Sequence, residues 1–156
     1  KQDVSLLYWL GSGWFGAMSQ DTMNVEIAMR VTNALACLKR AYELDPDYQK
    51  GALDELMIQV MASLPAEMGG SRDAAFKHFE KALRLSGGNS AGAYIAWGSS
   101  VLMNEQKREE FIEAMNKALA IDIEKQPDSK LVNVLNQQRA RYYLKNIDDY
   151  FLAPVE

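Results

Sequence analysis

The sequence has very few of the side chains that form disulfides, metal sites and catalytic pairs. Its 156 residues include one cysteine, Cys37, and one histidine, His78. A single cysteine has no partner for a disulfide within the chain, and a single histidine excludes a metal site built on several histidines. We therefore expect no cofactor and no metal, and we expect His78 to have a structural role as a hydrogen-bonding side chain.

Runs of lysine or arginine are also missing, and the formal net charge is −4. A nucleic-acid-binding surface normally carries a basic stripe, so nucleic acid is not an expected partner. The longest apolar stretch, residues 4–18, is interrupted by serines and glycines. It is too short to span a bilayer, so we expect no transmembrane segment in this chain.

No stretch alternates apolar and polar residues with the period of two that is typical of strands. Three segments instead share one pattern at positions i, i+1, i+4, i+7 and i+8, which lie on one face of a helix. A helix with one apolar face needs neighbours to bury it, so the recurrence predicts stacked copies. The copies are Ala34-Leu35-Leu38-Ala41-Tyr42, Ala75-Phe76-Phe79-Ala82-Leu83 and Phe111-Ile112-Met115-Ala118-Leu119.

The pattern, with its turn and capping signals, predicts about seven helices. Ser71 is a plausible N-cap, and Gly87-Gly88 can take the left-handed conformation that ends many helices. The expected helices cover residues 4–19, 25–44, 49–64, 72–85, 90–103, 105–121 and 129–151.

The helices pair into units of unequal length. The segment between the first bulky residue of a unit and its repeated alanine runs from Leu7 to Ala41 in the first unit. In the third unit it runs only from Tyr94 to Ala118. The extra residues of the first unit fall around 19–25 or lengthen the second helix of that unit. The extra residues of the second unit fall in the loop 65–70. We predict one helical-repeat domain, 1–156, with units at 4–46, 49–87 and 90–123 and a C-terminal capping helix at 129–151.

The first helix of each unit resembles that of a tetratricopeptide repeat, in which a bulky residue, a Leu-Gly pair and an aromatic recur. Tyr94, Trp97-Gly98 and Val101 show the pattern in the third unit. The resemblance implies an all-α fold of stacked antiparallel helix pairs, a TPR-like α-α superhelix.

A second resemblance is more particular. Leu64-Pro65 with Gly69-Gly70, followed by His78-Phe79 and Ala82-Leu83, resembles the T-component of tripartite ATP-independent periplasmic (TRAP) transporters. The resemblance implies a periplasmic, often lipid-anchored protein that partners the transporter's solute-binding protein. It also implies a homo-oligomer, a trimer with a hydrophobic channel through each protomer, and further helices before this region.

In tetratricopeptide repeats the first helices line a concave groove, and the corresponding positions here are small, apolar and nearly uncharged, with Asp54 as the one charged exception. Lysine, arginine and asparagine, which clamp peptide carboxylates, do not occur among them. A small hydrophobic ligand or an apolar helix therefore fits this groove better. The candidate ligand-binding residues are Tyr8, Ser12, Phe15, Gly16, Ile58, Met61, Ile95, Ser99, Leu102 and Met103.

Two alternatives stay open for the groove. The last helix carries an apolar stripe that includes Leu131 and Leu135, so it could fill the groove and turn the candidate residues into core. The glycines of the first helices, among them Gly11, Gly16 and Gly98, either allow close helix packing, which we favour, or keep a bore open.

We predict a non-enzymatic periplasmic accessory component of a TRAP-type transporter. It would bind the solute-binding subunit and offer an apolar groove or channel to a hydrophobic ligand. The alternative is a generic TPR-like interaction scaffold that binds an apolar helical peptide. An enzyme is not expected, because the sequence shows no pairing of a nucleophile with a base.

Overall fold

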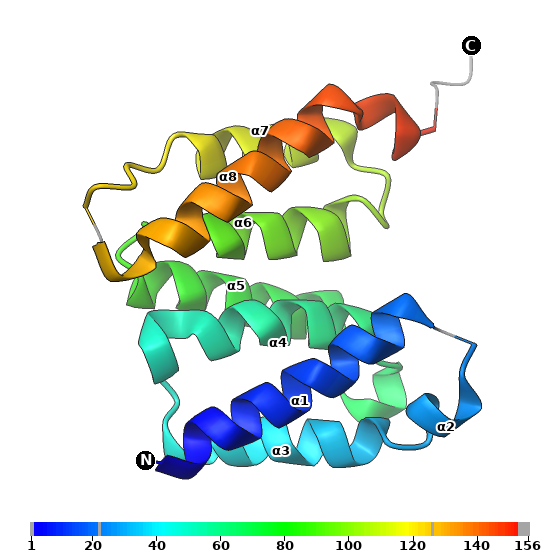
Figure 1. The fold of residues 1–156 in the computed structure, drawn as a ribbon. Helices are drawn as coiled ribbons and strands as arrows, with labels where there is room; N and C mark the ends of the chain where they lie inside the picture. Colours follow the sequence, from blue (N-terminus) through cyan, green and yellow to red (C-terminus); the bar gives the residue numbers. More distant parts are fainter. Residues whose placement is uncertain (1, 22, 126, 153–156) are drawn as a thin grey trace.

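A computed structural model describes residues 2–21, 23–125 and 127–152. Eight α-helices occur in these ranges, and no strand does. Figure 1 shows the helices layered from α1 and α3 at one end to α8 at the other. The helices are α1 (Gln2–Gln20), α2 (Val25–Ala28), α3 (Val31–Leu44), α4 (Ala52–Ser63), α5 (Arg72–Leu85), α6 (Ala91–Trp97), α7 (Arg108–Leu119) and α8 (Lys130–Lys145).

The helices stack in pairs, as the repeat pattern predicted. α1 packs on α3, α4 on α5, and α6 on α7, while α8 covers α6 and α7. The all-α class and the stacked pairs are therefore confirmed. The three repeated alanines, Ala41, Ala82 and Ala118, are fully buried at the contacts between helices.

Small side chains let the backbones approach closely at these contacts. A Cβ added at Gly51 would lie 3.1 Å from the Cα atom of Ala82. A Cβ at Gly11 would lie 2.4 Å from Cδ2 of Leu38, where α1 crosses α3. Close packing therefore accounts for Gly11, as favoured from the sequence.

Several helix boundaries follow local signals. The Ser71 hydroxyl accepts a hydrogen bond from the Ala74 amide, so Ser71 is the N-cap of α5. Gly87 and Gly88 have φ of 60° and 77° and end this helix in the left-handed region. The predicted loop 65–70 contains a short 3₁₀ turn, Ala66–Met68.

The expected helix over 25–44 is divided in two. α2 ends at Ala28, the amide of Arg30 bonds to the Ile27 carbonyl, and α3 begins at Val31. This tight turn changes the direction of the chain, so α3 can pack along α1. The extra residues of the first unit are thus a short helix with its turns, which gives eight α-helices in the described ranges where about seven were expected.

Two further segments depart from regular α-helix. The expected helix 90–103 continues past α6 as a π-helical turn, Gly98–Leu102, in which the Met103 amide bonds to the Gly98 carbonyl. A Cβ at Gly98 would lie 2.5 Å from Cε of Met115, so the glycine lets this turn approach α7. The expected last helix, 129–151, ends earlier, with α8 at Lys145 and a 3₁₀ turn at Ile147–Asp149.

Candidate functional site

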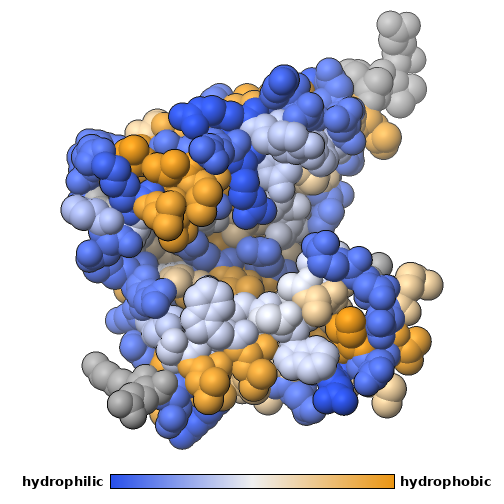
Figure 2. Space-filling view, viewed as in Figure 1, coloured by the Kyte–Doolittle hydropathy of each residue, from blue (hydrophilic) through white to orange (hydrophobic). Residues whose placement is uncertain are grey.

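An open cleft lies between the first helices of the three pairs. Its volume is about 860 Å³. Figure 2 shows the molecule hollowed between the layer that contains α1 and the layer that contains α6. The described lining residues are Ser12, Phe15, Gly16, Met18, Ser19, Leu56, Gln59, Val60, Ala62, Ser63, Ser99, Ser100 and Asn104.

Three elements build the walls of the cleft. The C-terminal half of α1 forms one wall, α4 forms the floor, and the π turn with Asn104 forms the opposite wall. α8 contributes none of the described lining residues, because it packs on α6 and α7 instead. Its described residues therefore leave the cleft open, and its own apolar side chains Leu131 and Leu135 stay exposed.

The cleft lining is uncharged. None of its described members is an acid, a lysine, an arginine or a histidine. Serine hydroxyls and two amide side chains alternate with apolar groups such as Phe15, Met18 and Leu56. Such a surface suits a ligand or segment with both apolar and neutral polar parts.

Four of the candidate residues line the cleft: Ser12, Phe15, Gly16 and Ser99. Four others lie in the hydrophobic core, where they are at most 7% exposed: Ile58, Met61, Ile95 and Leu102. Tyr8 and Met103 are half-buried and pack against the edge of this core.

Sequence reasoning missed the part of α4 that faces the cleft. The repeat comparison selected Ile58 and Met61, but α4 is rotated so that Leu56, Gln59 and Ser63 line the cleft. These residues have the spacing i, i+3 and i+7 of one helix face. The signal available in the sequence was the pair of polar residues, Gln59 and Ser63, in the otherwise apolar stretch after Glu55.

The glycines of α1 serve two purposes. Gly11 allows α1 to approach α3, whereas a Cβ at Gly13 or Gly16 would meet no atom within 4 Å. Gly16 lies in the cleft wall, and its missing side chain keeps that part of the cleft empty.

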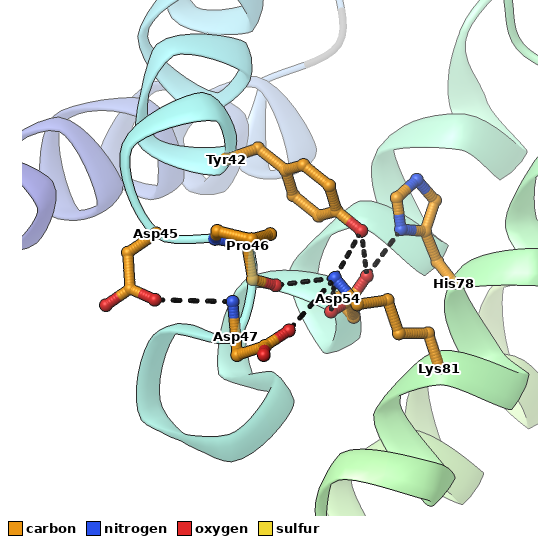
Figure 3. Close-up of polar contacts among 7 residues, drawn as sticks. All are labelled: Tyr42, Asp45, Pro46, Asp47, Asp54, His78 and Lys81. Carbon is orange, nitrogen blue, oxygen red and sulfur yellow. Dashed lines mark hydrogen bonds and ion pairs between the residues drawn. The ribbon is translucent and has the colours of Figure 1, made fainter.

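A polar cluster joins the first two helix pairs on a different part of the molecule (Figure 3). At its centre is Asp54 of α4, which is fully buried. Its Oδ1 accepts a hydrogen bond from the Tyr42 hydroxyl at 3.1 Å and lies 2.7 Å from Nδ1 of His78. Asp54 thus lies among side chains of α3 and α5, and not on the cleft surface where the repeat comparison placed it.

Lys81 completes this cluster. Its Nζ donates to the Tyr42 hydroxyl at 2.7 Å and to the carbonyl of Pro46 at 2.6 Å. It also lies 3.6 Å from Oδ2 of Asp54, which has no hydrogen-bond partner of its own within the described ranges. The positive charge next to a buried carboxylate offsets much of the cost of removing that carboxylate from water.

The cluster changes the acid–base behaviour of two of its members. Burial raises the pKa of the Tyr42 hydroxyl above its usual value of 10.0, and the hydrogen bond from Lys81 only partly offsets the shift. Burial alone would lower the pKa of Lys81, but the hydrogen bond with Tyr42 and the charge of Asp54 outweigh it, so that pKa is raised. Both shifts favour the protonated forms in the folded protein.

This cluster is a structural joint, by which we mean a set of polar contacts that holds α3, α4 and α5 together. None of its side chains lines the open cleft. In the described part of the chain, no group of three or more His, Cys, Asp or Glu side chains could hold a metal ion. The hydrogen bond of His78 is the structural role expected from the sequence.

A smaller polar cavity of about 410 Å³ lies between the start of α4, the turn before α6 and the start of α8. Glu55 lines it and accepts a hydrogen bond from the Ser90 hydroxyl. Burial raises the pKa of Glu55, the hydrogen bond from Ser90 partly lowers it, and the charge of Asp54 raises it further. Gly92 leaves room for this carboxylate, since a Cβ there would lie 2.1 Å from Oε2.

The described residues form an all-α protein of stacked helix pairs with an open, uncharged cleft. Comparison with known families is specific: residues 1–151 match the family described as TRAP transporter T-component. The chain belongs to this family, and the resemblance predicted from the Leu64–Gly70 segment is confirmed. The family description identifies its members as the T-component of TRAP transporters.

A curated relative supports the same membership. The chain is 33% identical over 152 residues to an uncharacterized protein of Treponema pallidum (strain Nichols). The match covers 97% of this chain and 47% of the relative, so the chain spans about half the length of the relative it matches. Within the described ranges, every helix is too short or too polar to cross a membrane.

Proposed function

We propose that this protein is a non-enzymatic accessory component of a TRAP-type transporter that binds a small hydrophobic ligand in the cleft between α1, α4 and the π turn. The observation that carries the proposal is the uncharged cleft of about 860 Å³, which α8 leaves open. The proposed partner is the periplasmic solute-binding protein, which the family's place in TRAP transporters supports.

The same family membership supports a periplasmic location, a lipid anchor and a trimeric assembly as parts of the proposal. The channel implied by the resemblance corresponds best to this cleft. First helices line this cleft, and Ser12, Phe15, Gly16 and Ser99 lie in its walls.

The proposed ligand site is tested by a substitution that places a large side chain in the cleft. Gly16→Leu adds a side chain where nothing lies within 4 Å, and the change favours the helix by about 1 kcal/mol, so the fold is retained. Purified protein is extracted with organic solvent, and co-purified lipid is identified by mass spectrometry. The wild type should yield an apolar ligand and Gly16→Leu should not.

The matched control is Gly13→Leu. Gly13 lies on the same helix, also has open space around it, and is not among the cleft residues. Equal ligand loss in both variants would contradict a site in the cleft. Co-purification of an apolar peptide instead of a lipid would favour the alternative function, a TPR-like interaction scaffold.

The partner claim is tested with the cognate solute-binding protein, the one encoded with the same transporter. A complex should form at tens of micromolar in sedimentation velocity and persist in both glycine variants. Absence of a complex at that concentration with the wild type would refute the partner claim and leave the ligand claim to its own test.

A further inference from the structure

Four of the five serines among the described cleft residues share one property that narrows the chemistry of the ligand. Three serine hydroxyls in the cleft walls donate their single proton to a carbonyl of their own helix: Ser63 to Val60 at 3.0 Å, Ser99 to Ile95 at 2.8 Å, and Ser19 to Gly16 at 2.8 Å. Ser12 does the same toward the Tyr8 carbonyl. A hydroxyl has one proton, so only the oxygen lone pairs of these four side chains are left to face a ligand.

Asn104 adds a further acceptor. Its amide group donates one N–H to the Ser100 carbonyl at 2.9 Å, which leaves its side-chain oxygen as an acceptor and its second N–H as a donor. The π turn contributes two successive cleft residues, Ser99 and Ser100, to the same wall. A π turn is an uncommon and irregular element that is often found at functional sites.

The apolar residues of the cleft belong to the same lining as these acceptor oxygens. Phe15 and Met18 lie on the α1 wall, while Leu56, Val60 and Ala62 form the floor on α4. The ligand therefore meets apolar groups along its length and acceptor oxygens near the two walls. Charged groups are absent from the described lining.

This inference rests on the proposed ligand-binding function and names its ligand class. We infer that the cleft selects a neutral amphiphile with one aliphatic chain and a head group that carries several O–H or N–H donors, such as a glycerol monoester. The acceptors bind the donors of the head group, and the aliphatic chain contacts Phe15, Met18 and Leu56. Gln59 faces the same cleft, and its amide group can both donate and accept.

Charged amphiphiles fit this cleft less well. A fatty carboxylate would bring acceptors toward the four serine oxygens, and it would lose its hydration with no cation among the described cleft residues. A quaternary ammonium head would bring charge without a donor, and no carboxylate occurs among the described cleft residues to balance it. Amphiphiles that have the same aliphatic chain should therefore differ in affinity according to their head groups.

The experiment compares three C12 amphiphiles below their critical micelle concentrations: 1-dodecanoylglycerol, dodecanoate and dodecyltrimethylammonium. Affinities for the delipidated full chain are measured by isothermal titration calorimetry at pH 7.5. The glycerol ester should bind at least about tenfold more tightly than either charged amphiphile. A carboxylate that binds as tightly as the ester would overturn the inference while leaving the ligand function intact.

Two variants connect the selectivity to the serines. Ser99→Ala should weaken binding of the glycerol ester by about fivefold and leave dodecyltrimethylammonium unchanged. Ser5→Ala, an exposed position of α1 outside the described cleft lining, should change neither affinity. An unchanged ester affinity in Ser99→Ala would count against the acceptor role. If none of the three amphiphiles binds the wild type, the proposed ligand function fails together with this inference.

Discussion

The hydroxyl of Tyr42 in α3 donates a hydrogen bond to Oδ1 of Asp54 in α4 at 3.1 Å, across the boundary between the first and second helix pairs. Lys81 of α5 donates to the same hydroxyl, so the bond is part of a cluster that spans three helices (Figure 3). Because α1 is packed on α3, the position of the α1 wall of the cleft depends on this joint.

Asp54→Asn should lower the free energy of unfolding by about 2–4 kcal/mol. The substitution keeps the shape of the side chain but removes the negative charge that faces Lys81 and His78, and breaking a buried ion pair on one side is costly. Urea denaturation followed by circular dichroism measures the change. Glu43→Gln, which breaks the exposed pair between Arg40 and Glu43, is the control and should cost about 0.5 kcal/mol or less.

The stability of the protein should fall at alkaline pH. The pKa values of Tyr42 and Lys81 are raised above 10.0 and 10.5, so the folded state holds both protons more tightly than the unfolded chain. Their contribution is complete below about pH 10 and is lost as the pH rises through the folded-state pKa values.

Tyr42→Phe tests the origin of this alkaline loss. The variant should be less stable at pH 8 and should decline less steeply between about pH 9.5 and pH 11.5. The decline should not vanish, because burial also raises the pKa of Tyr8. Melting temperatures measured at closely spaced pH values are the readout, and parallel curves for wild type and variant would refute the assignment.

Glu55→Gln should stabilise the protein at neutral pH. The pKa of Glu55 is raised above 4.5, chiefly by burial, so its contribution to stability is present below that value and is lost as the pH rises through the folded-state pKa. Glutamine removes the charge and can still accept from Ser90. The gain in melting temperature should be present at pH 7.5 and absent below about pH 4.

Glu113→Gln is a control of opposite sign. The hydrogen bond and charge of Lys117 lower the pKa of this exposed carboxylate, so its contribution is present above 4.5 and lost as the pH falls through the folded-state value. Its neutralisation should slightly lower the melting temperature at pH 7.5. A gain at Glu113 or a loss at Glu55 would show that burial is not the dominant cause at Glu55.

Gly70→Ala should destabilise the protein by about 3 kcal/mol or more, because a Cβ there would lie 1.9 Å from the backbone oxygen of Leu64 and the chain would have to move. Gly69→Ala should cost only about 1 kcal/mol. The φ of Gly69 is 91°, but no atom lies within 4 Å of a Cβ there, so strain in the backbone is the only cost. Equal losses in the two variants, measured by urea denaturation, would contradict this account of the loop.

Local sequence signals predicted the helices well because they act over a few residues. The serine cap at Ser71 and the glycines Gly87 and Gly88 act within one helix, and the structure has them as expected. The repeated alanines are buried as the pattern predicts, although Phe76 of the same pattern is exposed. The division at Met29–Arg30 and the π turn were missed. In each of these two segments the backbone forms hydrogen bonds with a spacing other than that of the α-helix. Packing against neighbouring helices favours these conformations over a continuous α-helix.

The sequence led us to expect a groove along the first helices, and only some of the candidate residues line the cleft of the structure. Its first-helix walls follow from the repeat, and Phe15 and Gly16 of α1 lie where the repeat comparison placed them. The rotation of α4 brings Gln59 into the cleft and takes Asp54 into the polar cluster. That rotation is set by partners distant in sequence, since Tyr42 and Lys81 pair with Asp54 from two other helices.

The two boundaries between helix pairs differ in chemistry. Aromatic rings join the second pair to the third, with Phe79 of α5 stacked on Trp97 of α6 at a centroid distance of 5.2 Å. The first boundary combines an edge-to-face contact between Tyr42 and His78 with hydrogen bonds and ion pairs to the buried Asp54. Hydrogen bonds weaken steeply when their geometry changes, whereas stacked rings tolerate small displacements. The α1 wall of the cleft is therefore held by contacts that tolerate little change in geometry, so a small shift at Asp54 changes the width of the cleft.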